Sequence, residues 1–276
     1  MIAAPTLTMN DGHQIPQLGL GVFQVDPIET AEPVRIALDV GYRLIDTAQG
    51  YRNEEAVGEA LASSGIANDV FVTTKLRNGE QGRDKTLAAF DASMRRLRLE
   101  VLDLFLIHWP LPKRDLYVET WKTFDELRHE GRIRSIGVSN FAVEHLQRLV
   151  DETAVVPAVN QIELHPRFPQ EELRAFHAQH GVLTEAWAPL GQGRGLLAEP
   201  LLTEIGRSKN KSPAQVVLRW HLQLGNVVIP KSVTPSRIRE NFDVFDFSLD
   251  DAEMHQISGL ATGDRLGPDP RTFDAS

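Results

Sequence analysis

The chain has 276 residues, of which 42% are hydrophobic and 24% are charged, and it carries a formal net charge of −9. This excess of acidic residues argues against a nucleic-acid partner, because phosphate backbones are bound by basic surfaces. The sequence contains no cysteine, which excludes disulfides and thiolate metal sites and is compatible with the reducing cytoplasm, where we expect the protein.

Signals for secretion and for membrane insertion are not evident in the sequence. Residues 1–10 show no basic segment followed by a long apolar stretch, so we expect no signal peptide. No apolar run approaches the roughly 20 residues that span a bilayer, and we expect no membrane partner. The length is close to that of one eight-stranded barrel, so we expect a single domain over residues 1–276.

The first structural signal is a hairpin. Asn10, Asp11 and Gly12 form a turn sequence between runs that contain Leu7 and Ile15. An Asp-Gly pair flanked by hydrophobic residues is a strong hairpin signal. We therefore expect an N-terminal β-hairpin that covers one end of the domain.

Eight apolar runs of strand length then alternate with helical patterns. We expect strands near 18–21, 42–46, 70–74, 103–107, 133–137, 158–162, 182–187 and 227–229. We expect helices near 28–40, 53–63, 84–98, 116–130, 142–151, 169–180, 212–224 and 235–242. Strict alternation favours a parallel sheet with covered faces, and eight units favour closure into a (β/α)8 barrel.

Two features complete the predicted fold at its C-terminal end. Ser212 and Gln215 form a capping-box pattern around Pro213, which fixes the start of one helix. An amphipathic stretch near 250–258 predicts an extra helix, and the sequence from Gly259 to Ser276 predicts a loop.

Three predicted strands end in a titratable residue. Asp46, Lys75 and His108 follow apolar runs, and Tyr51 lies in the turn beyond Asp46. The carboxyl ends of barrel strands face one mouth, where active sites lie. These four side chains, gathered there, can donate a proton to a carbonyl oxygen. Each one alone also has an ordinary structural explanation, as a cap, a solvated lysine, a core histidine or a half-buried aromatic.

Seven short motifs, in order, resemble those of the aldo-keto reductases. They are GYRLIDTA at 41–48, YRNE at 51–54, VLDL at 101–104, IHWP at 107–110, IGVSNF at 136–141, NQIELHP at 160–166 and IPKS at 229–232. The resemblance runs from about Leu7 to about Leu260, and the bacterial 2,5-diketo-D-gluconate reductase branch is the most similar. It implies a (β/α)8 barrel that catalyses NADPH-dependent carbonyl reduction, and a monomer.

The resemblance gives the four polar residues specific roles. Tyr51 is expected to be the general acid, since hydride transfer to a carbonyl carbon builds negative charge on the oxygen. Lys75 is expected to lower the pKa of Tyr51, because a nearby cation favours the phenolate. Asp46 is expected to hold Lys75 in place, and His108 to orient the carbonyl oxygen.

Two glycine-rich fragments, GLG at 19–21 and GQGRG at 191–195, lack the G-x-G-x-x-G pattern of a Rossmann fingerprint. The expected cofactor contacts therefore follow from the resemblance. Ser139, Asn140 and Gln161 are expected to hold the nicotinamide carboxamide, and Trp187 to stack on the ring, although it could equally be a core aromatic. The segment from Pro189 to Gly193 is expected to wrap the pyrophosphate. The expected cofactor contacts also include Gly21, Val22, Phe23, Asp46, Ala188, Leu190, Gly191, Gln192 and Val233.

The adenosine end of the cofactor site can be argued from charge. Lys231, Ser232 and Arg237 lie around the predicted helix that starts after Thr234. Helix N-termini bind phosphate through free amides and the dipole. These three residues therefore suit the 2′-phosphate of NADP, although a solvated basic helix start explains them too. We expect the residues one turn later to meet the adenine, namely Glu240 and Asn241.

Substrate choice is expected to depend on the residues around the mouth. They are Phe23, Gln49, Tyr51, Arg77, His108, Trp109 and the C-terminal loop. Many relatives carry tryptophan where this chain has Arg77, and a small or apolar residue where it has Gln49. A polar, cationic lining would favour small polar, dicarbonyl or anionic substrates, unless Arg77 points into solvent.

Two functions of other classes are alternatives. The barrel could bind NADPH as a regulatory or structural subunit, although such a subunit need not retain all four polar residues. It could be a metal-dependent hydrolase, which would need converging histidine and carboxylate ligands at the strand ends. Only His108 is well placed, with His165 just past the sixth strand, so we expect no metal site.

Overall fold

The computed structural model describes residues 4–275, which contain an eight-stranded parallel sheet. Each strand pairs with the next in chain order. Leu18 and Gly21 bridge to Val228 and Lys231 in parallel, so the first and last strands meet and the sheet closes into a barrel. The strands are β3 (Leu20–Gly21), β4 (Leu44–Asp46), β5 (Phe71–Leu76), β6 (Leu102–Ile107), β7 (Ile133–Ser139), β8 (Val159–Glu163), β9 (Leu183–Trp187) and β10 (Val227–Val228).

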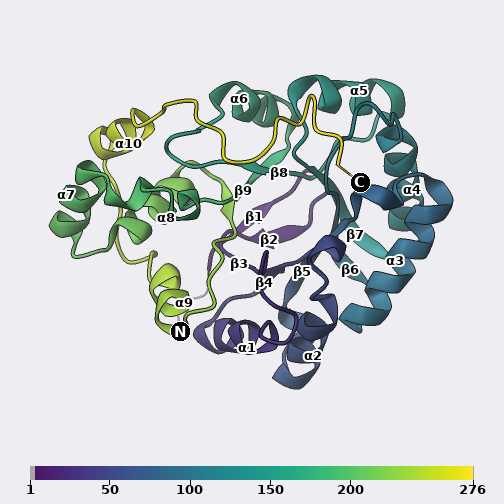
Figure 1. Ribbon diagram of the computed structural model, residues 1–276, viewed down its shortest axis with the longest axis horizontal. Helices are drawn as coiled ribbons and strands as arrows, with labels where there is room; N and C mark the ends of the chain where they lie inside the picture. The colour runs from purple at the N-terminus through teal and green to yellow at the C-terminus, as the bar shows by residue number, and fades with distance from the viewer. Residues whose placement is uncertain (1–3, 276) are drawn as a thin grey trace.

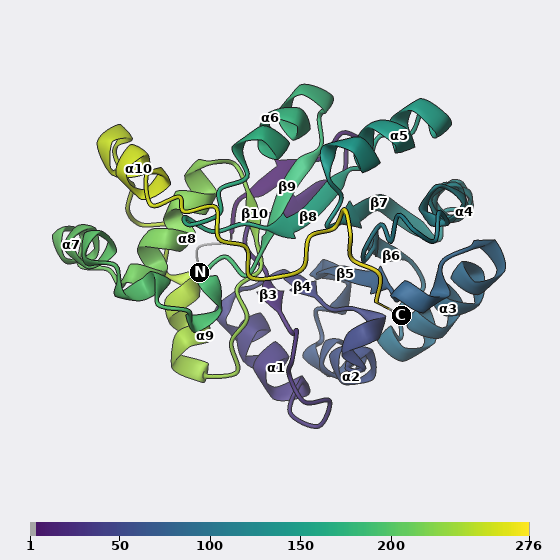
Figure 2. The same cartoon turned by 45° about the horizontal axis from the view of Figure 1, so that its top comes forward.

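Helices surround the barrel, and this confirms the (β/α)8 fold expected from the alternation (Figures 1 and 2). They pack on the strands through a continuous hydrophobic core, in which Phe105 of β6 stacks on Phe124 with ring centroids 4.3 Å apart. The helices that follow the strands are α1 (Ala31–Val40), α2 (Glu54–Ser64), α3 (Arg83–Leu97), α4 (Tyr117–His129), α5 (Val143–Thr153), α6 (Glu171–His180), α8 (Pro213–Gln223) and α9 (Pro235–Phe242).

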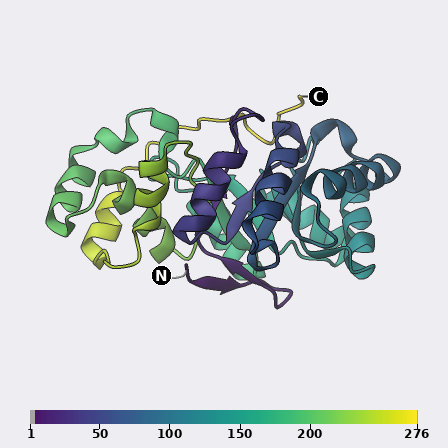
Figure 3. The same ribbon diagram turned by 90° about the horizontal axis from the view of Figure 1, so that it is seen from below.

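A hairpin covers the amino-terminal end of the barrel, as the turn sequence predicts. Strands β1 (Thr6–Thr8) and β2 (Gln14–Pro16) pair antiparallel, with Leu7 opposite Ile15. Met9 and Ile15 are buried in a small apolar cluster with inward residues of the barrel such as Leu104. Figure 3 shows the hairpin at one end of the barrel and the C-terminal tail at the other.

The structure departs from the expected elements in two places. Helix α7 (Pro200–Lys209) lies between β9 and α8, where no helix was expected. Pro200 in the first turn of α7 is a helix-start signal in the sequence. The prediction missed it because it assumed one helix after each strand, and α7 is a second helix between β9 and β10. Helix α1 begins at Ala31 rather than near residue 28, because the Asp26 side chain and carbonyl accept hydrogen bonds from Ile28 and Thr30 and hold a turn.

The remaining elements lie in loops and at the C-terminus. Short 3₁₀ turns are η1 (Gln49–Tyr51), η2 (Ala67–Asp69), η3 (Asn78–Glu80), η4 (Gly191–Gly193) and η5 (Leu196–Ala198). The expected extra helix is α10 (Asp251–Ser258), which Asp250 caps by accepting a hydrogen bond from the Glu253 amide at 2.8 Å. Within residues 4–275, no helix is long and apolar enough to cross a membrane.

The tail after α10 runs across the carboxyl end of the barrel (yellow in Figure 1). The amides of Thr262 and Gly263 donate to the Arg167 carbonyl, and the Phe273 ring packs on Trp109 with centroids 4.4 Å apart. The tail therefore forms part of the mouth where the strand ends meet.

Gly58 of α2 lies so close to α3 that the structure has no room for a side chain. A Cβ there would lie 2.4 Å from the Arg96 carbonyl oxygen. Alanine in a helix is normally about 1 kcal/mol better than glycine, but overpacking against backbone costs about 1–3 kcal/mol. We expect Gly58→Ala to lower the free energy of unfolding, measured by urea denaturation.

Gly79→Ala is the matched control, since a Cβ at Gly79 meets nothing within 4 Å. Its effect should stay within about 0.5 kcal/mol. A Gly58→Ala variant as stable as the parent would show that α2 and α3 can move apart at little cost.

Candidate active site

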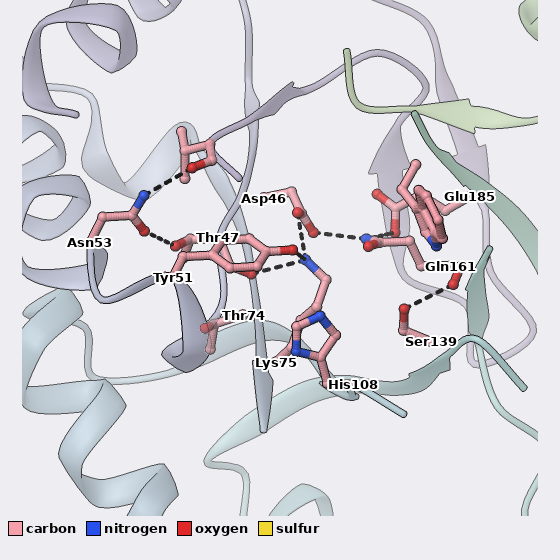
Figure 4. A network of polar contacts seen from close by, with 12 residues as sticks. Asp46, Thr47, Tyr51, Asn53, Thr74, Lys75, His108, Ser139, Gln161 and Glu185 are labelled. Atoms are coloured by element: carbon pink, nitrogen blue, oxygen red, sulfur yellow. Dashed lines mark hydrogen bonds and ion pairs between the residues drawn. The ribbon is translucent and has the colours of Figure 1, made fainter. Parts of the chain in front are cut away.

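The strand ends bring the four predicted polar residues together at one mouth. Asp46 is the last residue of β4, Lys75 lies near the end of β5, and His108 follows β6. Tyr51 ends η1, the turn between β4 and α2. Figure 4 shows the Lys75 ammonium directed at both Asp46 and Tyr51.

A buried ion pair lies at the centre of this group. Lys75 Nζ lies 2.5 Å from Asp46 Oδ1, and it also donates to the Thr47 carbonyl at 3.1 Å. Burial raises the pKa of Asp46, whereas the Lys75 ammonium and the Gln161 amide oppose this rise. Burial disfavours the charge of Lys75, but Asp46 more than compensates and holds the pKa of Lys75 above its ordinary value. The short contact between Lys75 Nζ and Asp46 Oδ1 is that of an ammonium–carboxylate ion pair.

Tyr51 lies beside this ion pair. Lys75 Nζ donates to the Tyr51 hydroxyl oxygen at 3.3 Å, and the Tyr51 ring packs against Phe23 with centroids 5.0 Å apart. Burial raises the pKa of Tyr51 above its ordinary value, while the Lys75 charge lowers it. Lys75 thus acts in the expected direction, but burial is the larger effect and leaves the pKa of Tyr51 above its ordinary value. Tyr51 keeps its proton at neutral pH.

His108 faces the edge of the Tyr51 ring, with ring centroids 5.8 Å apart. Burial, assisted by the positive charge of Lys75, lowers the pKa of His108 to about 3. The imidazole is therefore neutral at physiological pH and carries a single N–H, which can serve as a hydrogen-bond donor.

Buried side chains fix the turn that carries Tyr51. Asn53 donates to the Val22 carbonyl at 2.9 Å and accepts a hydrogen bond from the Thr47 hydroxyl at 2.8 Å. Arg52 adopts the left-handed conformation, with φ 61°, and ends the turn. These contacts join the end of β4 to the loop after β3, so the Tyr51 hydroxyl has a defined position.

A cavity of about 1080 Å³ opens at this mouth and extends to α9. Asp46, Tyr51 and His108 line it, whereas Lys75 is buried behind Tyr51. The expected cofactor and substrate residues that line it are Gly21, Phe23, Trp109, Ser139, Asn140, Gln161, Trp187, Ala188, Pro189, Leu190, Gln192, Gly193, Lys231, Ser232, Val233, Arg237, Glu240 and Asn241. Val22 and Gly191 are buried outside this lining.

The residues expected at the nicotinamide hold one another in place. Gln161 Nε2 donates to Asp46 Oδ2 at 2.8 Å, and Trp187 Nε1 donates to Asn140 Oδ1 at 2.7 Å. Asn140 Nδ2 in turn donates to the His108 carbonyl at 3.0 Å. At this end of the cavity, hydrogen-bonded polar side chains thus form a fixed surface beside the Trp187 ring.

The other end of the cavity suits a phosphate group. Lys231 and Arg237 are exposed there, and neither forms an ion pair with any residue of the described chain. Helix α9 begins beside them, and no side chain caps its first amides. Unpaired cations next to free helix amides fit an anion such as the 2′-phosphate of NADP.

Gln49 and Arg77 do not line the cavity. The Gln49 amide nitrogen donates to the Ala89 carbonyl and the Ser93 hydroxyl, and its oxygen accepts from the Arg77 amide at 2.9 Å. Gln49 thus joins η1 to α3, and the Arg77 side chain is exposed. Their role in substrate choice stays a prediction that the cavity lining does not support.

Sequence reasoning missed Glu163, which holds the tail over the cavity. Its buried carboxylate accepts hydrogen bonds from the Leu266 amide at 2.5 Å, the Gly267 amide at 2.8 Å and His165 Nε2 at 3.1 Å. Gly267 lies so close to the Trp187 ring that a Cβ would sit 2.8 Å from it. The NQIELHP motif contains Glu163 and His165, but the partners of Glu163 in the tail lie about 100 residues away and leave no local signal.

The expected C-terminal loop contributes Leu266, Gly267 and Pro268 to the cavity lining. The lining also includes residues that were not expected, namely Gln24, Leu197, Ser212, Pro213, Ala214, Ile229, Pro230 and Thr234. Among residues 4–275, no group of three or more histidine and acidic side chains is arranged to hold a metal ion.

The chain is similar to known proteins over almost its whole length. Residues 17–262 match the model of the Aldo/keto reductase family. An aldo-keto reductase of Mycolicibacterium smegmatis is 59% identical over 272 residues, covering 98% of each chain. Methylglyoxal reductase DkgA of Escherichia coli is 51% identical over 275 residues, covering 99% of each chain.

Solved structures are similar over the same length. The structure of a Gox0644 mutant in complex with NADPH superposes with a TM-score of 0.95, at 52% identity and with 99% of each chain covered. The aldo-keto reductase MGS-M4 from a deep-sea metagenome superposes with the same TM-score at 40% identity, covering 98% of this chain and all of the other.

The Glu163 contact with the tail can be tested by hydrogen exchange. We expect Glu163→Gln to speed exchange of the Leu266 and Gly267 amides about tenfold or more at neutral pH, because hydrogen bonds to a charged group are worth about 1.5–3 kcal/mol. Asp274→Asn, which breaks the partly exposed ion pair with Arg114, is the control. It should change the exchange rates of the Leu266 and Gly267 amides little. Unchanged exchange in Glu163→Gln would mean that other contacts hold the tail.

The same contact should be lost in acid. Burial opposes the Glu163 charge, but His165 and the two amides hold the pKa of Glu163 below its ordinary value. A lowered pKa stabilises the contact above the ordinary pKa of about 4.3, and this stabilisation is lost as the pH falls through the lowered value. Exchange of the tail in the parent protein, corrected for its intrinsic rate, should therefore rise only below about pH 4.

Proposed function

Because the chain belongs to the aldo/keto reductase family, we propose that it is an NADPH-dependent oxidoreductase that reduces aldehydes and ketones to alcohols. The observation that carries this proposal is the Tyr51 hydroxyl, which lines the cavity while Lys75 Nζ donates to it from behind at 3.3 Å. An acid held between a cation and an open cavity is placed to protonate a bound carbonyl oxygen.

The four polar residues divide the chemistry among them. NADPH, when bound, supplies the hydride to the carbonyl carbon. Tyr51 gives its proton to the oxygen, and Lys75 stabilises the resulting phenolate by its charge. Asp46 keeps Lys75 protonated and in place through the 2.5 Å contact. The neutral His108 ring donates its N–H to the carbonyl oxygen and orients it.

The residues that line the cavity suit successive parts of the cofactor. Asn140, Gln161 and Ser139 would hold the carboxamide beside Trp187, and the segment after Trp187 would wrap the pyrophosphate. Lys231 and Arg237 would hold the 2′-phosphate at the start of α9. The structure of the similar Gox0644 mutant is a complex with NADPH, which supports NADPH as the cofactor.

For substrate, we propose small polar carbonyl compounds, with dicarbonyls foremost. Relatives named methylglyoxal reductase DkgA are 50–51% identical to this chain, and methylglyoxal is a small dicarbonyl. Phe23 and Trp109 narrow the mouth beside Tyr51, and Leu266 of the tail also lines it. An opening lined by such apolar side chains beside the Tyr51 hydroxyl suits a small molecule.

A regulatory or structural subunit that binds NADPH without turnover is the alternative. The buried ion pair counts against it, since cofactor binding alone does not require Lys75 and Asp46 to be desolvated next to Tyr51. An assay with methylglyoxal and NADPH separates the two. The cytoplasmic location, the monomeric state and the single-domain organisation stay predictions.

Tyr51→Phe should reduce kcat/KM for methylglyoxal by roughly 10²–10⁴-fold, because the general acid is lost. Its affinity for NADPH should stay nearly unchanged. The assay follows the loss of NADPH absorbance, with Tyr117→Phe, whose hydroxyl lies 3.5 Å from Arg148 away from the cavity, as the control. A Tyr51→Phe enzyme with parental turnover would exclude Tyr51 as the acid.

Arg237→Ala should weaken NADPH binding about tenfold or more, since a hydrogen bond to a charged group is worth about 1.5–3 kcal/mol. NADH lacks the 2′-phosphate, so its affinity should change little. Fluorescence titrations with both cofactors measure the difference, and Arg239→Ala, on the same helix but outside the cavity lining, is the control. Equal losses for NADPH and NADH would mean that Arg237 does not contact the 2′-phosphate.

A further inference from the structure

Glu185 is a buried acid that the proposed reaction does not use. It lies in β9, points into the barrel, and has no exposed surface. In the register of the sheet it pairs with Gln161 of β8. An ionisable side chain at such a position is costly unless it has a partner, so its contacts identify its role.

Gln161 links Glu185 to the catalytic ion pair. Its amide nitrogen donates to Glu185 Oε2 at 2.9 Å and to Asp46 Oδ2 at 2.8 Å (Figure 4). The Asp46 carboxylate can only accept, so it fixes the amide with its nitrogen toward the two acids, and Glu185 Oε2 accepts from the same nitrogen. Within residues 4–275 no group donates to Gln161 Oε1, which leaves this oxygen available to a ligand in the cavity that Gln161 lines.

The charges around Glu185 favour its neutral form at physiological pH. Lys75 and Asp46 already balance each other, so an ionised Glu185 would leave one uncompensated negative charge in the barrel. Its second oxygen, Oε1, is buried and has no hydrogen-bond partner among the described residues. Burial, together with the nearby Asp46 carboxylate, raises the pKa of Glu185 to about 8.

Within residues 4–275, the other titratable groups around Glu185 keep their charge between about pH 6.5 and 9. Lys75 and Tyr51 have pKa values above their ordinary ones, and His108 has a pKa of about 3. Glu163, at the end of β8, has a lowered pKa. The neighbouring β10 contributes only valines. A change of charge in this range therefore comes from the two acids Asp46 and Glu185. They share one proton at physiological pH, and Glu185 holds it.

We propose that Glu185 is a positioning residue that sets the amide of Gln161 for the nicotinamide and that its proton couples the site to the oxidation state of the cofactor. This rests on the proposed function, since it requires that NADP bind against Gln161. The oxidised nicotinamide ring carries a positive charge and the reduced ring carries none. An ionised Glu185 therefore favours NADP⁺ over NADPH, and by reciprocity NADP⁺ favours loss of the Glu185 proton.

The test is the ratio of the dissociation constants of NADP⁺ and NADPH, measured by titration from pH 6.5 to pH 9. In the parent protein this ratio should fall about tenfold as the pH rises through the pKa of Glu185. The 2′-phosphate is common to both cofactors, so its own titration cancels in the ratio. In Glu185→Gln the ratio should stay flat, because the amide cannot ionise.

A comparison of Glu185→Gln with Glu185→Leu separates the positioning of Gln161 from the charge of Glu185. Glu185→Gln keeps an oxygen that accepts from Gln161, so its affinity for NADPH at pH 7 should stay close to that of the parent. Glu185→Leu removes the acceptor and should weaken NADPH about tenfold. Glu163→Gln is the matched control, a buried glutamate of the same barrel that is ionised throughout the range, and it should keep the pH step in the ratio.

Proton release is an independent readout that needs no turnover. Calorimetry of the parent protein near pH 7.5 in two buffers of different ionisation enthalpy should show net proton release with NADP⁺ but less with NADPH. Glu185→Gln should remove this difference. A flat ratio in the parent protein, or a step that persists in Glu185→Gln, would overturn the inference. A protein that fails to bind either cofactor would instead contradict the proposed function.

Discussion

The site depends on a lysine and an aspartate that are desolvated together inside the barrel. Lys75 has no exposed surface and Asp46 has 2%, so each charge is tolerable only because the other lies 2.5 Å away. Removing one partner of such a pair is far more costly than removing both. The ion pair therefore constrains everything attached to it, namely the Tyr51 hydroxyl on one side and the Gln161 amide on the other.

The barrel and the gathering of four polar residues at its mouth could be predicted because their signals are local. Alternating apolar runs and helical patterns define the barrel, and Asp46, Lys75 and His108 stand out as polar residues that end such runs. The roles of Glu163 and Glu185 could not be predicted, because their partners follow from strand register and from the path of the tail. The contact of the Gln49 side chain with α3 likewise depends on how the helices pack, which the spacing of residues in the sequence does not reveal.

The structure separates the groups for which we propose catalytic roles from those at the opening of the cavity. The former lie on or next to β4, β5 and β6. Buried hydrogen bonds join Lys75 to Asp46 and Tyr51, and the His108 ring packs against Tyr51. The latter, including Phe23, Trp109 and Leu266, lie on loops and on the tail, where 45% of Phe23 is exposed. Changes in the loops can therefore alter which carbonyl compounds enter without disturbing the ion pair, as expected for a barrel scaffold.

The opposite placement of the hairpin and the tail has a practical consequence for attaching the protein to a surface or to another enzyme. The described chain starts beside the hairpin, at the end of the barrel away from the mouth, and it finishes across the mouth (Figure 3). A linker fused before residue 4 leaves the opening free, whereas a linker after residue 275 emerges next to Asn78, whose amide donates to the Ala275 carbonyl. Immobilisation through the N-terminus is thus the orientation that keeps the catalytic face toward the solution.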